Sequence, residues 1–431
     1  MASWGRLSAQ PHRVQRLTDR HRLDLARGPA EGPGLPYGNG RSYGDVCLNS
    51  GGLLWATRGL DRFIEFDPIS GVIECEAGVL LDDIIAVALP AGWFLPVTPG
   101  TRFVTLGGAI ANDVHGKNHH RAGTLGEHVL GLTLARSDGS RIDCSPAHEA
   151  RWLRATIGGL GLTGLIVRAR LQLQPVPGPW LQTESLSYDK LADFFHLSRE
   201  SERNWDYHVS WLDCVHGGEF EARGVFFRAN HIAHDAPAPA ARTRSLPLTP
   251  PFSLINQTSL RAFNKAYFAL NRRRTGLQYQ HLLPFFYPLD GLLGWNRIYG
   301  PRDFYQYQCV LPRAVETDAV AGLLRAIRVS GQGSFLAVLK TFSDRASAGL
   351  LSFPMAGTTL ALDFPNQGAR TEQLFAQLDA IVGAAGGRLY PAKDARMPAA
   401  LFRQGYPRLA EFLPYRDAGI ASAMSRRLMP A

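Results

Sequence analysis

Hydrophobic and polar positions alternate over several short segments in the first part of the chain, which predicts half-buried strands separated by turns. Gly, Asp-Pro or Ser-Asp-Gly interrupts these segments, which are residues 53–60, 62–68, 71–78, 128–144 and 165–176. Between them, residues 79–92 (VLLDDIIAVALPAG) carry apolar residues at helical spacing and end in Pro-Ala-Gly. This stretch predicts an amphipathic helix.

A proline cluster at residues 175–179 separates this first region from one of different content. Beyond it, the pattern predicts strands rich in aromatic residues, then a helix and two more strands. These are residues 207–215, 304–312, 317–331, 335–342 and 358–365. The order predicts an antiparallel sheet with helices on one face. We therefore expect an α+β fold with a first domain at 1–178, completed by 388–431, and a second at 179–387.

Residues 231–274 interrupt the second domain, and we expect a flexible loop there. Residues 235–251 are rich in Pro, Ala, Ser and Thr, which is typical of a mobile loop. Residues 260–274 alternate aromatic residues with Lys and Arg. They either lie on an anionic membrane surface or pack on the domain as a helix with a solvated basic face.

Composition narrows the class of protein. The 431 residues carry 46 Lys+Arg against 37 Asp+Glu, which favours an anionic partner. Five dispersed cysteines contain no CxxC pair and make a poor disulfide framework and a poor zinc site, so we expect a reducing compartment and no metal. The chain shows no signal-peptide pattern and no apolar run of ~18 residues. A cytoplasmic protein, soluble or peripheral to the membrane, is expected.

Three glycine-bearing segments stand out as candidate chemistry: residues 38–45 (GNGRSYGD), 99–116 and 158–164 (GGLGLTG). Glycine lets the backbone approach a ligand closely, and successive N–H groups in such turns bind phosphate oxygens. None of the segments matches the P-loop, and none is a GxGxxG that opens a helix after a strand. The three together favour a large phosphate-bearing cofactor over a Rossmann nicotinamide site.

Three segments resemble, in their order along the chain, the FAD domain of the vanillyl-alcohol oxidase / p-cresol methylhydroxylase flavoproteins. They are PYGNGRSYGD, PGTRFVTLGGAIANDVHGKNHHRAGTLGEHV and GGLGLTGLI. With FYQYQCVLP, LALDFP and GGRLYPAKDARMPAALFRQGYPR, the chain more closely resembles the decaprenylphosphoryl-β-D-ribose 2-oxidases. The resemblance runs from about residue 38 to the C-terminus, except for 230–275. It implies a two-domain flavoprotein with an FAD-binding domain and a substrate domain whose antiparallel sheet is flanked by helices.

The resemblance also implies an activity. The enzyme would oxidise the C2 hydroxyl of a polyprenyl-phosphate-linked β-D-ribose to the 2-keto sugar. This is the first half of an epimerisation to the arabinose donor for cell-wall polymers. A short-chain NAD(P)H reductase would act on the keto product. The expected partners are therefore the lipid-linked sugar, that reductase and the membrane surface, with no nucleic acid.

The cofactor residues follow from the same resemblance, together with the need of reduced flavin for a nearby hydrogen-bond donor or positive dipole. Those implied are Gly38, Asn39, Gly40, Arg41, Ser42, Tyr43, Gly100, Thr105, Leu106, Gly107, Gly108, Asn112, His115, Ile166 and Tyr390. Wider relatives attach FAD covalently through a His in a GxGHS loop, and Arg41 occupies that position here. We expect non-covalent FAD, with attachment at His115 as the alternative.

The resemblance implies three catalytic residues: Lys393, His115 and Lys117. Lys393 matches the lysine placed over the flavin, where it acts as a base, stabilises the developing alkoxide or binds the substrate phosphate. Lys117 would reach the flavin edge or the substrate. We interpret the adjacent His119 and His120 as structural, because neighbouring side chains on a strand point apart.

For substrate binding we expect Gln306 and Gln308, which alternate on one strand and so face one side. The other candidates are Trp211, Lys340, Tyr43 and Lys393. Some family members carry Cys where this chain has Ala361, which leaves the pocket shape open. Two other functions stay open: a soluble sugar-alcohol or aldonolactone oxidase, and a non-catalytic basic binding protein whose flavin site has decayed.

Overall fold

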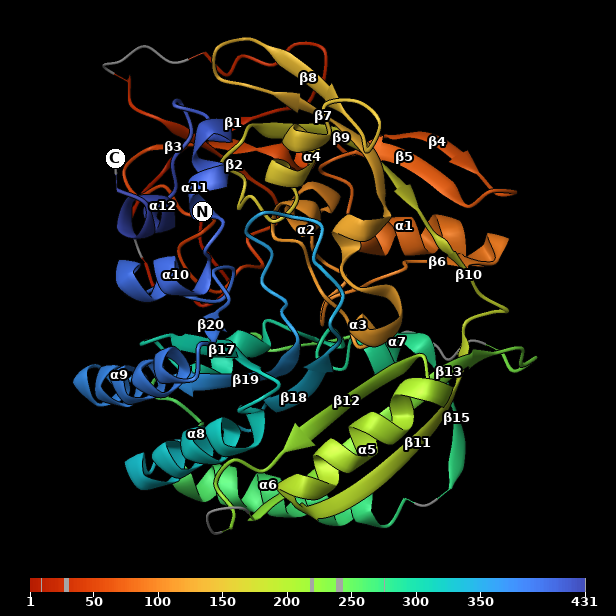
Figure 1. Ribbon diagram of the computed structural model, residues 1–431, viewed down its shortest axis with the longest axis vertical. Coiled ribbons are helices and arrows are strands. Elements are labelled where there is room, and N and C mark those ends of the chain that lie inside the picture. The colour runs from red at the N-terminus through yellow and green to blue at the C-terminus, as the bar shows by residue number, and fades with distance from the viewer. Residues whose placement is uncertain (9, 27–30, 218–220, 238–242, 275, 431) are drawn as a thin grey trace.

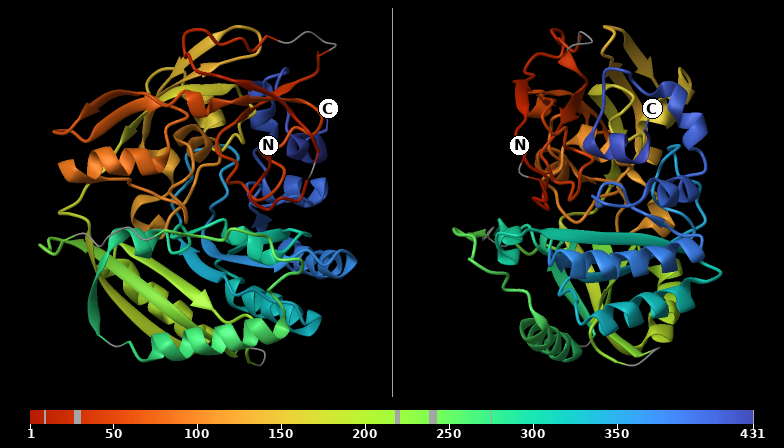
Figure 2. Two further views of the ribbon diagram at one scale, coloured as in Figure 1. Left: turned by 180° about the vertical axis from the view of Figure 1, so that it is seen from behind. Right: turned by 90° about the vertical axis from the view of Figure 1, so that its left-hand side faces the viewer.

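The helices and strands form two stacked parts, seen one above the other in Figure 1. The computed structural model describes residues 1–8, 10–26, 31–217, 221–237, 243–274 and 276–430. Most of the first 175 residues lie in the upper part, and residues 180–365 make most of the lower part. The C-terminal segment returns to the upper part, so that both ends of the chain lie there (Figures 1 and 2).

Two sheets build the upper part. The first is parallel, in the order β1-β3-β2, and the second is antiparallel, in the order β4-β5-β9-β7-β8. Their bounds are β1 Arg13–Arg16, β2 Gly34–Tyr37, β3 Leu53–Ala56, β4 Phe63–Asp67, β5 Val72–Glu76, β7 Val129–Ala135, β8 Arg141–Cys144 and β9 Leu165–Gln172. All the strands predicted from the alternating segments of this region are present.

The predicted amphipathic helix of this part is α1 (Leu81–Ala88). Asp82 and Asp83 lie in its first turn, where the helix dipole favours negative charge. Gly92 ends the stretch with φ +82°, a conformation that glycine adopts without strain. The other helices are α2 Leu106–Ala111, α3 His119–Ala122 and α4 Ala150–Thr156. The expectation that the two adjacent histidines lie on a strand is wrong, because both belong to α3.

An eight-stranded antiparallel sheet builds the lower part, in the order β15-β11-β13-β12-β18-β19-β17-β20. Its strands are β11 Trp180–Lys190, β12 Tyr207–Leu212, β13 Glu221–Ile232, β15 Leu277–His281, β17 Phe304–Pro312, β18 Ala337–Phe342, β19 Gly357–Pro365 and β20 Arg388–Leu389. The predicted antiparallel sheet is therefore confirmed, and β20 joins it from the C-terminal segment. Short pairs β6 (Trp93–Phe94) with β10 (Gln174–Pro175) and β14 (Arg244–Ser245) with β16 (Leu292–Leu293) lie outside the three sheets.

Three helices cover one face of this sheet and a fourth covers part of the other. They are α5 Leu191–Asn204, α8 Glu316–Ser330, α9 Ala369–Ala384 and, on the opposite face, α6 Gln257–Arg272. Phe226 of β13 packs on Phe194 of α5, whereas Trp211 of β12 packs on Tyr267 of α6. The predicted loop at 231–274 thus contains a sixteen-residue helix. Part of the expected mobile stretch, 238–242, lies outside the described residues.

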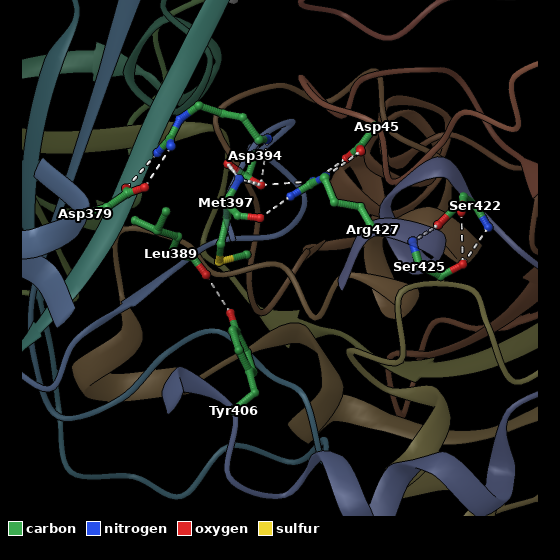
Figure 3. A network of polar contacts seen from close by, with 10 residues as sticks. Asp45, Asp379, Leu389, Asp394, Met397, Tyr406, Ser422, Ser425 and Arg427 are labelled. Carbon is green, nitrogen blue, oxygen red and sulfur yellow. Dashed lines mark hydrogen bonds and ion pairs between the residues drawn. The ribbon is translucent and has the colours of Figure 1, made fainter. Parts of the chain in front are cut away.

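The C-terminal segment is fastened to the first glycine-rich segment by the ion pair between Arg427 and Asp45 (Figure 3). Its helices are α10 Ala399–Gly405, α11 Leu409–Phe412 and α12 Ala423–Leu428. Arg427 lies 2.8 Å from Asp45 Oδ1 and 3.0 Å from Asp394 Oδ2, and the hydroxyl of Tyr406 donates to Leu389 O at 2.8 Å. Because 388–431 is held in this way, we propose the expected division into 1–178 with 388–431 and 179–387.

The described helices do not include one whose length and apolar content would let it cross a bilayer. All five cysteines are described and none forms a disulfide.

Candidate active site

A cavity of about 940 Å³ lies where the two parts meet. Its wall is formed by all three glycine-bearing segments, the α6 side of the eight-stranded sheet and the segment 390–393. It contains every predicted site residue but one: Gly38, Asn39, Gly40, Arg41, Ser42, Tyr43, Gly100, Thr105, Gly107, Gly108, Asn112, His115, Lys117, Ile166, Trp211, Gln306, Gln308, Lys340, Tyr390 and Lys393. The exception is Leu106, whose side chain is fully buried in the hydrophobic core beside the cavity.

The first glycine segment lies tightly against the second. A Cβ on Gly38 would come within 2.4 Å of the Thr105 hydroxyl, and Gly40 has φ +60°. The Asn39 amide donates to Phe103 O at 2.7 Å. These contacts explain why the backbone here requires glycine: a side chain would push the two segments apart.

The second segment enters helix α2 with Thr105 as its N-cap, and the Thr105 hydroxyl accepts a hydrogen bond from Gly108 N. Asn112 ends the helix, and its amide donates to Gly108 O at 2.8 Å. The Tyr390 hydroxyl donates to Asn112 O at 2.9 Å, so the returning C-terminal segment contacts this helix directly. Residues more than 270 positions apart thereby form one wall.

Lys393 lies over the aromatic ring of Tyr43. Its Nζ is 4.0 Å from the ring centroid, a distance at which a cation is attracted to the π face. The backbone holds the pair in place, because Tyr43 N–H donates to Ala392 O at 3.1 Å. A Cβ on Gly44 would lie 1.7 Å from Asp394 O, which shows how closely the two segments pack.

Three lysines converge on the cavity from three elements: Lys117 after α2, Lys340 on β18 and Lys393 near the C-terminus. Burial, and to a lesser extent the charges of the other two lysines, lower the pKa of Lys340 to about 7. Burial lowers the pKa of Lys117 to about 8, while Asp290 acts in the opposite direction. Burial also lowers the pKa of Lys393, against the attraction of Asp363. Mutual repulsion of this kind favours an anionic ligand.

Gln308 and His115 join the two parts of the molecule across the cavity. The Gln308 amide nitrogen lies 3.1 Å from His115 Nε2 and 3.3 Å from the Thr359 hydroxyl. An amide nitrogen only donates, so Nε2 accepts and the imidazole proton is on Nδ1. Nδ1 is buried without a partner among the described residues. Burial lowers the pKa of His115 well below its usual value, and Lys340 adds to this effect, so the ring is neutral.

Gln306 lies on the same strand face as Gln308, as predicted. Its amide donates to Asp363 Oδ1 at 2.6 Å. Tyr305 and Tyr307 point the other way, onto Phe375 of α9. Burial raises the pKa of the Asp363 carboxyl, and its Oδ2 has no partner among the described residues. Asp363 lies in the motif LALDFP and was not predicted as a site residue, although a charged residue in a continuous apolar strand is a signal of function.

Two residues of the cavity wall were also not selected from the sequence. Trp4 stands outside all the glycine segments, and Asp290 lies in a stretch without a recognised motif. Asp290 Oδ2 accepts from the backbone N–H of Arg102 at 2.9 Å. Only the fold brings these residues to the cavity, so no local pattern could have found them.

Three side chains at the edge of the site make packing contacts. His119 Nδ1 accepts from Ser343 N–H at 3.2 Å, and the ring of His120 lies 4.4 Å from that of His208. Trp211 donates to Phe335 O at 2.9 Å and presents its ring to the cavity beside Tyr267. Within the described ranges, no group of three or more metal-ligating side chains is gathered.

The cavity residues fit a large dinucleotide. A volume of about 940 Å³ is at the upper end of the usual range for ligand sites. A Cβ on Gly100 or Gly161 would meet nothing within 4 Å, so bare backbone faces open space there. Arg41 Nε and Asn112 Oδ1 are buried without partners in the described part of the chain. Such atoms are the donors and acceptors that a bound cofactor would satisfy.

Comparison with known proteins agrees with this geometry. A family model described as an FAD binding domain matches residues 29–145. Over 99% of this chain and 97% of the relative, the sequence is 35% identical to the decaprenylphosphoryl-β-D-ribose oxidase of Mycolicibacterium smegmatis. The chain belongs to the decaprenylphosphoryl-β-D-ribose oxidase family. An uncharacterised protein in the mprA 5′ region of Streptomyces coelicolor is 34% identical over 79% of this chain and 95% of its own length.

More distant flavin enzymes match only part of the chain. Mouse L-gulonolactone oxidase is 30% identical over 32% of this chain and 31% of its own length. As a member of the decaprenylphosphoryl-β-D-ribose oxidase family with an FAD-binding domain, the protein is an FAD-dependent oxidoreductase. The predicted family, α+β flavoprotein fold and cofactor are therefore confirmed. The roles of individual site residues stay predictions.

Proposed function

We propose that this protein oxidises the C2 hydroxyl of a polyprenyl-phosphate-linked β-D-ribose to the 2-keto sugar. The observation that carries the proposal is the convergence of Lys117, Lys340 and Lys393 on the same cavity as the glycine segments. Positive charge gathered in a buried site is costly unless an anion neutralises it, and a lipid phosphate is such an anion. The named activity of the full-length relative supports the same substrate class.

FAD, when bound, supplies the acceptor for the hydride that leaves the carbinol carbon. The glycine segments 38–45, 99–116 and 158–164 would hold it, with Tyr390 and Ile166 as further walls. The chain's own residues accept the hydroxyl proton and bind the sugar. Lys393, whose pKa is lowered by burial, is suited to take that proton in its neutral form. Gln306 and Gln308 offer amide groups to the ribose hydroxyls.

His115 has a different task from an acid or a base. Its ring is neutral and its Nε2 accepts from Gln308, which leaves the Nδ1–H as a fixed donor inside the site. A fixed neutral donor stabilises negative charge that develops on a bound group without itself changing charge. Lys117 and Lys340 would hold the phosphate. Lys340 Nζ donates to Gly116 O at 3.3 Å, and Lys117 Nζ donates to Phe286 O at 2.9 Å.

We further propose that FAD is held without a covalent bond. Arg41, at the position of the linking histidine in wider relatives, cannot form the histidyl bond, and its guanidinium lies 4.3 Å from the ring of Trp4. His115 already uses Nε2 for Gln308. Acid precipitation should therefore release all the flavin into the supernatant, and yellow colour in the washed protein pellet would contradict the proposal.

We also propose a peripheral position at the cytoplasmic side of a membrane, and the surface around α6 supports the membrane contact. Leu270 is 61% exposed and Phe263 45% exposed, and both also line the cavity, so this helix stands where the cavity meets solvent. Arg261, Lys265 and Arg272 are exposed on the same helix. Apolar side chains beside basic ones suit an anionic lipid surface. A lipid-linked substrate would enter there, and a short-chain NAD(P)H reductase would then consume the keto sugar.

The test is anaerobic mixing of the purified yellow protein with polyprenyl-phosphoryl ribose. We expect the absorbance of the oxidised flavin at ~450 nm to be lost after mixing. Free polyols or sugar lactones should leave this absorbance unchanged. Bleaching by xylitol or a lactone, with none by the lipid-linked ribose, would instead establish a soluble sugar-alcohol or aldonolactone oxidase. Protein that is colourless and takes up no FAD would indicate a binding protein with a decayed site.

A further inference from the structure

Residues 2–6, here called the N-terminal strap, lie against the first glycine segment. Trp4 N–H donates to Ser42 O at 2.8 Å, and Gly5 N–H donates to Tyr43 O at 3.2 Å. The Tyr37 hydroxyl donates to Ala2 O at 2.7 Å. The strap therefore adds a backbone-paired layer to the loop that carries Arg41, Ser42 and Tyr43.

The other edge of the strap is attached to the lower part of the molecule. Phe304 N–H, at the start of β17, donates to Gly5 O at 3.4 Å, and the Asn296 amide donates to Trp4 O at 3.0 Å. Arg6 forms an ion pair with Asp303 at 3.1 Å. A Cβ on Gly5 would lie 2.4 Å from Tyr43 O and 2.9 Å from Phe304 O. Glycine is thus required where the strap passes between the two domains.

Trp4 is the strap residue that reaches the cavity. Its indole lines the wall, and the Arg41 guanidinium carbon lies 4.3 Å from the ring centroid. Phe103 flanks the same guanidinium at 5.7 Å, and Trp295 meets the Trp4 ring edge-on at 5.7 Å. Arg41 Nε is buried without a partner among the described residues. Aromatic faces, rather than hydrogen bonds, therefore fix the direction of this side chain.

We propose that Trp4 is a positioning residue for the cofactor: by fixing Arg41 and pairing with residues 42–43, the N-terminal strap closes one wall of the cavity and retains bound FAD. The inference rests on the FAD site and not on the identity of the sugar substrate. Loss of the Trp4 ring frees Arg41 and loosens the loop, so the flavin dissociates faster and becomes accessible to solvent. The role belongs to the ring face, which phenylalanine also provides.

The experiment measures FAD release from the holoenzyme, followed as the rise of free-flavin fluorescence after dilution. We expect Trp4→Ala to raise the dissociation rate at least five-fold and to increase quenching of the bound flavin by iodide. Trp4→Phe should restore both values to within two-fold of wild type. Gly5→Val, which forces the strap away from Tyr43 and Phe304, should behave like Trp4→Ala. Unchanged release and quenching in Trp4→Ala would overturn the proposal.

Trp205→Ala is the matched control. Trp205 also carries a stacked arginine, Arg228 at 4.8 Å, but lies outside the cavity wall. The Trp205→Ala variant should release FAD at the wild-type rate. If Trp205→Ala and Trp4→Ala accelerate FAD release equally, the effect reflects a general loosening of the fold, and the proposal is overturned. A wild-type protein that retains FAD but does not oxidise the lipid-linked ribose would contradict the proposed function while leaving the strap untouched.

Discussion

The Nζ atom of Lys393 lies 4.0 Å from the ring centroid of Tyr43, which joins the C-terminal segment to the first glycine segment inside the cavity. The aromatic face favours the charged lysine, whereas burial favours the neutral one. A lysine balanced in this way can take up or release a proton without leaving its position. This is the property that an alcohol oxidation requires of a base next to the flavin.

We expect Lys393→Met to keep the yellow flavin and to lose turnover at least 100-fold, the usual loss when a positioned proton acceptor is removed. The measurement is the visible spectrum together with steady-state turnover on the lipid-linked ribose. Lys190→Met, at an exposed position on the lower sheet, is the control and should retain full activity. Full activity in Lys393→Met would remove this lysine from the mechanism.

A second prediction concerns the link between Gln308 and His115. Gln308→Leu removes the donor at 3.1 Å and leaves His115 Nε2 buried without its partner, at a cost of about 1–3 kcal/mol. We expect kcat/KM to fall on the order of tenfold or more as the Nδ1–H loses its fixed direction. Gln373→Leu, on the exposed side of α9, is the matched control. If both variants have equal kcat/KM, the link has no role in positioning.

The alternating segments predicted the sheets, and β5 shows the reason: partly buried and buried residues alternate along Val72–Cys75, whereas β3 is buried along its whole length. β17 shows the same rule at the level of the site. Gln306 and Gln308 were assigned to one side from spacing alone, and both line the cavity, while Tyr305 and Tyr307 pack on α9. Local periodicity was sufficient there because the strand is flanked by the cavity on one face and by the helix on the other.

Contacts between distant segments could not be predicted in this way. Trp4 and Asp290 reach the cavity only through the packing of the two parts, and neither belongs to a recognised motif. Leu106 illustrates the opposite error. It lies within the glycine motif, but the helical turn of α2 directs its side chain into the core while Gly107 and Gly108 face the cavity. A motif identifies a segment, whereas the local backbone decides which residues reach the ligand.

A third prediction uses the pKa of Lys340, which burial lowers to about 7 from 10.5. Below pH 7 the folded and unfolded chains both hold the proton, so the cost of burying the charge is fully present. Between pH 7 and 10.5 the unfolded chain binds more protons, and stability therefore rises with pH. Lys340→Met removes this cost.

We therefore expect the flavin-free Lys340→Met variant to melt higher than wild type at pH 6, by on the order of 2 °C or more. The gain should shrink at pH 9. Calorimetry of both proteins at the two pH values measures it, with Lys190→Met as the exposed control. The same variant should bind the lipid-linked substrate more weakly. An equal or lower melting temperature at pH 6 would contradict the buried-charge argument.

The last prediction concerns the membrane surface proposed for α6. Replacing Arg261, Lys265 and Arg272 by Gln removes three exposed positive charges. At about 1 kcal/mol per basic residue near an anionic surface, the affinity for such vesicles should fall roughly 100-fold. Co-sedimentation with phosphatidylserine-containing vesicles measures the change, and added salt should weaken wild-type binding in the same direction.

The control for this helix changes net charge equally on the opposite side of the sheet, by replacing Lys190, Arg199 and Arg203 at or on α5 with Gln. That triple variant should bind the vesicles as wild type does, because its charges lie away from the cavity mouth. Flavin content should be unchanged in both triple variants. Equal losses would show that net charge alone drives association, and unchanged binding after the α6 substitutions would exclude this helix as the docking surface. Only a selective loss supports entry of the lipid-linked sugar beside Leu270, where an exposed apolar side chain also lines the cavity.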